Sequence, residues 1–95
     1  MEKPYVVTFN EKAIQSDWLK LDSAIKIRIK SAIQQKLQVN PRYFGIPLQN
    51  SLHGYFKLRV GNYRIIYKIL HIEHVVSIEG IQHRSIVYKE MRKRI

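Results

Sequence analysis

Apolar residues near the start of the chain change from the spacing of a strand to the spacing of a helix. Residues 5–9 are rich in β-branched and aromatic types, which predicts a strand. A short amphipathic helix is predicted over residues 11–20 by the spacing of Ala13, Ile14, Trp18 and Leu21. A second helix is predicted over residues 23–38 by the series Ile25, Ile29, Ile33 and Leu37. Positions 25–30 also alternate with a period of two, but the whole run is too long for a typical strand.

The second half of the chain has the alternation of paired strands. Asn40-Pro41 ends the second helix, and residues 41–54 are predicted to be a loop because proline and glycine recur in them. Strands are predicted over 55–60, 63–70 and 75–82, and a short terminal helix from residue 84 onward. The element order is therefore β-α-α-β-β-β-α. We expect an α+β fold of two layers, an antiparallel sheet packed against the two N-terminal helices.

The dipeptide Gly61-Asn62 predicts a tight turn and thereby a register for the hairpin around it. Val60 then faces Tyr63, and Arg59 faces Arg64. Because side chains alternate between the faces of a sheet, each face has its own set of residues. The expected core face carries Phe56, Leu58, Val60, Tyr63, Ile65, Tyr67 and Ile69. The opposite, basic face carries Tyr55, Lys57, Arg59, Arg64, Ile66 and Lys68.

Composition narrows the classes of protein that this fold can represent. The 95 residues suit one domain over residues 1–95, and the 45% hydrophobic content suits a globular fold. Cysteine is absent, which excludes a disulfide scaffold and a thiol nucleophile. We see neither a signal peptide nor an apolar run of membrane-spanning length, so we expect a cytoplasmic protein without a membrane partner. The net charge of +10 predicts a polyanionic partner, nucleic acid or an acidic protein.

The candidate chemistry lies on the basic face and at the end of the last strand. Two arginines placed opposite each other repel, so the Arg59–Arg64 pair suggests either an anion site or a solvated face whose charges splay apart. A second cluster follows the last strand and comprises Gln82, His83, Arg84 and Tyr88. His71 and His74 have no defined carboxylate partner, so we expect no metal site and no cofactor.

Two segments of the chain are similar to the signatures of the RelE/ParE toxin superfamily. Residues 52–67, which include LRVGNYR, resemble the central signature, and His83-Arg84 with Val87-Tyr88 resembles the C-terminal one. The resemblance implies the toxin half of a toxin–antitoxin pair. RelE-type members cleave mRNA at the ribosomal A site without a metal, whereas ParE-type members poison DNA gyrase. We therefore expect an mRNA endonuclease, with a gyrase inhibitor or a catalytically weak basic nucleic-acid-binding protein as the alternatives.

The resemblance also implies roles for individual residues. Lys57 and Arg64 match basic positions around the scissile phosphate, Tyr88 matches a tyrosine that contacts substrate, and His83 matches a position that is histidine in many members. The expected catalytic set is Lys57, Arg64, His83 and Tyr88. The expected RNA-binding set is Tyr55, Arg59, Lys68, Gln82 and Arg84. The chain departs from strongly active members of the superfamily at three positions. Those members often have lysine at the position of Tyr55, and they sometimes have arginine at the position of Gln82. A basic residue is also common in them at the position of Gln49.

RNA cleavage without a metal uses the 2′-hydroxyl as the nucleophile toward its own phosphate. The reaction needs an aligned phosphate, cations for the developing charge and proton transfer at two oxygens. No carboxylate lies on the basic face, so the proton acceptor is Lys57, Tyr88 or His83. The expected partners are mRNA, the ribosome and a cognate antitoxin that is acidic and partly disordered, because such a peptide would cover the basic charge. The exposed sheet edge and the grooves beside the helices are the expected docking surfaces.

Overall fold

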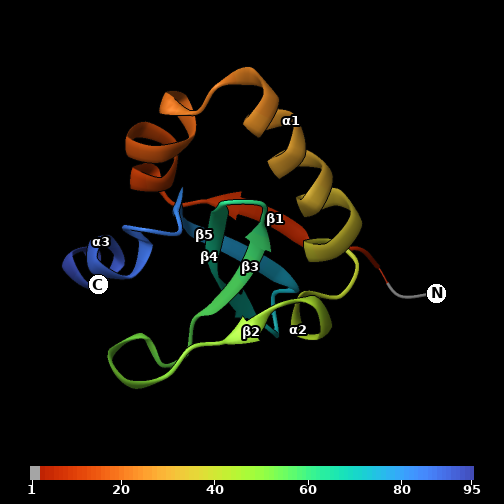
Figure 1. Cartoon of the computed structure of the whole chain (residues 1–95). Helices are drawn as coiled ribbons and strands as arrows, with labels where there is room; N and C mark the ends of the chain where they lie inside the picture. The colour runs from red at the N-terminus through yellow and green to blue at the C-terminus, as the bar shows by residue number, and fades with distance from the viewer. Residues whose placement is uncertain (1–2) are drawn as a thin grey trace.

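The computed structural model describes residues 3–95, which form one mixed sheet with helices on both of its faces (Figure 1). The strands are β1 (Val6–Phe9), β2 (Ile46–Pro47), β3 (Phe56–Val60), β4 (Tyr63–Leu70) and β5 (Val75–His83). The helices are α1 (Ser23–Ala32), α2 (Pro41–Phe44) and α3 (Val87–Arg94). Shorter helical segments are η1 (Ala13–Asp17), η2 (Trp18–Lys20), η3 (Ile33–Leu37) and η4 (Asn50–Leu52). Within the described residues no helix is long and apolar enough to cross a membrane.

The predicted hairpin and its register are confirmed. Val60 pairs with Tyr63 and Arg59 with Arg64, and β3, β4 and β5 form the expected antiparallel meander. Gly61 begins the turn with φ of 58°, a conformation that glycine adopts without steric cost. The two predicted N-terminal helices are also present, the first as η1 and η2 and the second as α1 continued by η3.

The expectation of a wholly antiparallel sheet was wrong at one edge. The strand order is β1-β5-β4-β3-β2, and β1 runs parallel to β5. After Phe9 the chain leaves the sheet, crosses it through the helical segments and re-enters at the far edge as β2. A helical crossover of this length permits parallel pairing, which short turns do not.

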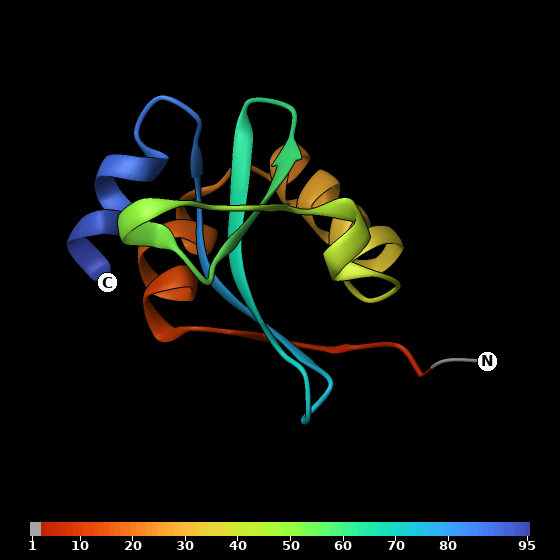
Figure 2. The same cartoon turned by 90° about the horizontal axis from the view of Figure 1, so that it is seen from below.

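The segment that we predicted as a loop, residues 41–54, contains structure of its own. Asn40 begins α2 by accepting a hydrogen bond from the Tyr43 backbone at 3.2 Å, and Pro41 occupies the first turn, where it needs no donor. Strand β2 then pairs with β3. Seen from below, this green segment crosses in front of the strands, on the side of the sheet away from α1 (Figure 2).

The main core lies between the N-terminal helices and one face of the sheet, as expected. It contains Leu58, Ile65 and Tyr67, with the other predicted core-face residues packed against them. The second face is also partly covered, which the two-layer prediction did not include. There Ile66 is fully buried in a smaller cluster with Leu48, Leu52, Val87 and Met91.

Helix α3 therefore packs on the basic face of the sheet, where Val87 and Met91 cover Ile66. A Cβ at position 80 would collide with the Met91 sulfur, so Gly80 allows the helix to approach the strand closely. A register shift between Ile66 and Tyr67 leaves Glu79 without a partner on β4. Because of this bulge, Ile78 and Ile81 both belong to the main core.

Candidate active site

Lys57 on β3 and Tyr88 on α3 meet on the basic face of the sheet. The Lys57 ammonium donates a hydrogen bond of 3.0 Å to the Tyr88 hydroxyl and lies 5.5 Å from the centre of its ring. Both side chains are half-buried. Helix α3 thus presents a hydroxyl to a strand lysine, although 31 positions separate the two residues in the chain.

Arg64 lies on the same face, one strand further into the sheet. Its register partner on β3 is Arg59, and Lys57 pairs with the neighbouring Ile66. The Arg64 guanidinium donates to the backbone carbonyls of Gly61 at 3.0 Å and Tyr63 at 2.9 Å. Two backbone bonds direct the cation toward the β3–β4 turn, so its position is set without a carboxylate partner.

Arg59 and Arg84 also lie close to this turn. Arg59 is exposed and lines a groove shared with α1, so the side chain extends around the edge of β3. The Arg84 backbone donates to the Asn62 carbonyl at 2.8 Å, which holds the chain after β5 against the turn. At the other end of β3, the Lys68 ammonium lies 5.6 Å from the centre of the Tyr55 ring. These four candidate RNA-binding residues therefore lie at the two ends of the basic face.

His83 is separated from Lys57, Arg64 and Tyr88. It pairs with Tyr63, whose side chain packs against the main core, and the two rings meet edge to face at 5.6 Å. Its Nδ1 is 2.8 Å from the Ser85 hydroxyl. Alternation along β5 thus places His83 on the opposite face, which corrects the expectation that it joins the catalytic cluster there.

Gln82 is buried and belongs to a polar network rather than to the solvent-facing surface. Its amide nitrogen donates to Asp17 at 2.9 Å, and its side-chain oxygen has no hydrogen-bond partner within the described residues. The expectation that Gln82 is available to RNA is therefore at variance with its position in the fold.

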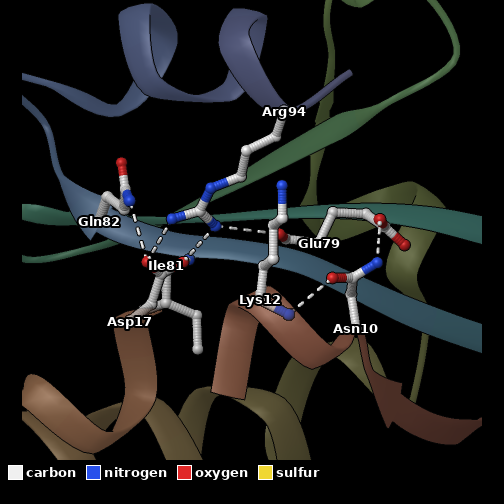
Figure 3. A network of polar contacts seen from close by, with 7 residues as sticks. All are labelled: Asn10, Lys12, Asp17, Glu79, Ile81, Gln82 and Arg94. Atoms are coloured by element: carbon white, nitrogen blue, oxygen red, sulfur yellow. Dashed lines mark hydrogen bonds and ion pairs between the residues drawn. The ribbon is translucent and has the colours of Figure 1, made fainter. Parts of the chain in front are cut away.

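Sequence reasoning missed Asp17, a buried carboxylate that holds α3 and Gln82 (Figure 3). Its carboxylate accepts from the Ile81 backbone at 2.9 Å, where β1 has ended and the edge of β5 is open. Arg94 on α3 binds the same carboxylate through two nitrogens, at 2.7 and 2.8 Å. The hydrogen bonds that Arg94 donates to the Asp17 carboxylate raise the pKa of Arg94 above its ordinary value. The network ties α3, and with it Tyr88, to the first helical segment.

A signal for this network was present in the sequence. Asp17 follows Ala13 by four residues, so the predicted helix places its carboxylate on the apolar face. A carboxylate at such a position needs a charged or hydrogen-bonding partner. Which of the seventeen basic residues supplies the partner depends on the path of the whole chain.

The side chains on the basic face can bind and neutralise a phosphate. Among residues 3–95 no group of three histidine or carboxylate side chains is placed to hold a metal ion. The cations there are Lys57, Arg64 and Lys68, and a tyrosine hydroxyl adjoins the first of them. This combination is typical of a site that stabilises phosphate charge through cations of the protein itself.

Comparison with known proteins identifies the family of this chain. Residues 7–88 match the family model of the ParE toxin of the type II toxin–antitoxin system parDE. The mRNA interferase toxin RelE of Escherichia coli strain K12 is 33% identical over 94 residues, which cover 96% of this chain and 97% of the relative. The chain therefore belongs to the RelE/ParE toxin superfamily, the toxins of type II toxin–antitoxin systems.

Solved structures resemble the fold closely. The toxin–antitoxin complex RelBE2 of Mycobacterium tuberculosis contains a chain that matches with a TM-score of 0.80 and 32% identity, covering 90% of this chain and 97% of that one. The isolated E. coli RelE toxin matches with a TM-score of 0.70 and 26% identity, covering 95% and 97%. The sequence-based identification of the superfamily is thus confirmed.

Proposed function

We propose that this toxin is a metal-independent endoribonuclease that cleaves mRNA at the ribosomal A site. The observation that carries the proposal is the 3.0 Å contact between Lys57 and Tyr88 on the face that also holds Arg64. The similarity to an mRNA interferase over almost the whole chain supports the same activity.

In this reaction the 2′-oxygen forms a bond to the adjacent phosphorus. The bond from that phosphorus to the 5′-oxygen of the next nucleotide breaks, and a 2′,3′-cyclic phosphate remains. One proton leaves the 2′-hydroxyl and one reaches the 5′-oxygen. The Lys57 ammonium donates to the Tyr88 hydroxyl, so Tyr88 can give its proton to the 5′-oxygen while it takes one from Lys57. The Lys57 nitrogen, then neutral, accepts the proton of the 2′-hydroxyl, and both residues end in their starting states.

Arg64 supplies the charge stabilisation in this proposal. Its guanidinium is held by two backbone carbonyls and keeps further N–H groups for a non-bridging phosphate oxygen. Tyr55 and Tyr88 provide ring faces on which bases can stack. His83 has a supporting role, because its ring packs against Tyr63 on the other face.

We also propose a cognate antitoxin that is acidic and partly disordered. The solved M. tuberculosis relative is a toxin–antitoxin complex, and a net charge of +10 favours an acidic inhibitor. An apolar groove of about 740 Å³ beside the N-terminal helices, lined by Phe9, Ile14 and Trp18, suits an amphipathic segment of that antitoxin. The edge strand β1 offers a second attachment. Ribosome and mRNA as targets imply a cytoplasmic protein.

The test is inducible expression in a bacterial host with transcript ends mapped by primer extension. Wild type, Arg64→Ala and the exposed control Lys20→Ala are compared, and circular dichroism and thermal melts verify that each variant folds. We expect cuts within translated codons for wild type and Lys20→Ala but none for Arg64→Ala. Growth arrest with intact transcripts would instead favour gyrase poisoning, and a folded Arg64→Ala variant that still cuts mRNA would remove Arg64 from the site.

A further inference from the structure

Arginines from four parts of the chain converge on the β3–β4 turn. Arg64 donates to the Gly61 carbonyl at 3.0 Å, and the Arg84 backbone donates to the Asn62 carbonyl at 2.8 Å. Arg59 precedes the turn by two positions. From α1, the Arg28 guanidinium lies so close to Gly61 that a Cβ there would come within 2.7 Å of it. Glycine therefore allows an arginine from another layer to cover the turn.

Arg28 and Arg59 face a groove that the candidate active site does not use. The groove has a volume of about 400 Å³ and runs between α1 and the end of β3. Lys36 is the third cation of its lining, and Ser31 and Gln35 add polar groups. No carboxylate lines it, and the single ion pair among residues 3–95 joins Asp17 and Arg94. Three cations thus share a groove without a neutralising acid.

Such a concentration of charge costs folding free energy through mutual repulsion. A bound polyanion would remove that cost. An arginine guanidinium can donate two hydrogen bonds to the oxygens of one phosphodiester group. A groove that is open to solvent can also accommodate a continuous nucleic-acid strand. Gly61 in the turn lines this groove and also accepts from the Arg64 guanidinium, so cations lie on both sides of the turn.

We propose that the groove formed by Arg28, Lys36 and Arg59 binds the phosphate backbone of an RNA segment outside the cleavage site. The inference rests on the proposed function, since it takes RNA as the substrate class. It assigns Arg59 to this second contact rather than to the scissile phosphate. RNA is favoured over an acidic peptide because the turn that borders the groove also holds Arg64, the cation that the proposed function places at the scissile phosphate.

The test measures RNA binding without cleavage. The probe is a fluorescent single-stranded 12-mer with 2′-O-methyl riboses, which lacks the nucleophile of the proposed reaction. Affinity is measured by anisotropy over a range of salt concentrations for the full chain. The groove variant is Arg28→Gln/Arg59→Gln. The matched control is Lys12→Gln/Lys20→Gln, which removes the same charge from exposed positions on the first helical segments.

The expected result is a smaller salt dependence for the groove variant alone. Losing two phosphate contacts on a single strand lowers the slope of log affinity against log salt by about 1.4. Equal changes in both variants would mean a general effect of net charge and would overturn the inference. It would also be overturned if the groove variant bound RNA normally but bound a labelled poly-glutamate peptide less tightly, because the groove would then be a site for an acidic protein. Since the probe cannot be cleaved, a wild type that fails to cut mRNA would refute the proposed function without affecting this result.

Discussion

Arg94 binds the Asp17 carboxylate through two guanidinium nitrogens, and this ion pair joins residues that are 77 positions apart in the chain. Their side chains are 1% and 9% exposed, so both charges are almost completely removed from water. The pair lies beside the open edge of β5, where Asp17 also accepts from the Ile81 backbone. It is the direct polar link between the first helical segment and the helix that carries Tyr88.

Breaking this pair from one side is expected to destabilise the protein strongly. Arg94→Met leaves the Asp17 carboxylate buried without its cation, a change that costs about 3–5 kcal/mol in unfolding free energy. Urea denaturation measures the loss. Arg92→Met, an exposed position on the same helix, is the control and should change the free energy by less than about 0.5 kcal/mol.

The double variant Asp17→Asn/Arg94→Met measures how much of this stability comes from the interaction between the two side chains themselves. Because it removes both charges, we expect it to lose less stability than the sum of the two single variants. Strict additivity would show that the two side chains do not interact in solution.

Removing the hydroxyl of Tyr88 is expected to reduce cleavage while preserving the packing of α3. Tyr88→Phe keeps the ring beside the smaller apolar cluster around Ile66 but loses the group that accepts from Lys57. A positioned proton-transfer group contributes about 10²- to 10⁴-fold to rate, so mRNA cleavage on ribosomes should fall in this range. Tyr43→Phe, whose parent side chain is 77% exposed, serves as the matched control. Full activity in Tyr88→Phe would exclude the hydroxyl from proton transfer.

We expect any side chain at position 80 to destabilise the protein while Met91 is present. Gly80→Ala places a methyl group against the Met91 sulfur, and overpacking of this kind costs about 1–3 kcal/mol. Thermal melts of Gly80→Ala, Met91→Ala and the double variant measure the coupling. We expect the double variant to be more stable than the sum of the single effects predicts, and the absence of any such rescue would contradict the close packing of α3 on β5.

Because the Tyr67 phenol is buried, we expect the folded protein to lose stability at alkaline pH. Its hydroxyl donates to the Pro41 carbonyl at 2.7 Å inside the main core, and burial raises its pKa above the ordinary value of 10.0. The neutral phenol is therefore favoured by folding. Its contribution is complete below about pH 10 and decreases as the pH rises toward the folded-state pKa, by about 1.4 kcal/mol per unit.

The measurement is urea denaturation of wild type and Tyr67→Phe at pH 9 and pH 11. The variant should be less stable at pH 9 by about 1 kcal/mol, the usual value of a lost hydrogen bond. At pH 11 wild type should have lost about 1.4 kcal/mol that the variant does not lose, because phenylalanine does not ionise. The order should therefore reverse, with Tyr67→Phe the more stable protein by about 0.4 kcal/mol. A difference that stays constant between the two pH values would contradict a buried, neutral Tyr67.

Much of the fold and part of the site could be predicted from the sequence because they depend on local spacing. Turn chemistry at Gly61-Asn62 determines the hairpin register, and the register determines that Lys57 and Arg64 share a face. The helices over residues 11–20 and 23–38 follow from their apolar series. The contact between Lys57 and Tyr88 does not follow from spacing, because it requires α3 to return across that face.

The sequence by itself determined the superfamily, the strands of the meander, the core face and the basic charge. These depend on side-chain periodicity and turn geometry, which act over a few neighbouring residues. Only the tertiary structure decided which edge β1 joins and that α3 covers the basic face. It also decided that His83 lies on the other face, that Gln82 is buried against Asp17 and that Asp17 binds Arg94. Each of these depends on contacts between residues far apart in the chain. Several such contacts are compatible with the same local pattern, and the one that forms is the one that lets the whole chain bury its apolar surface.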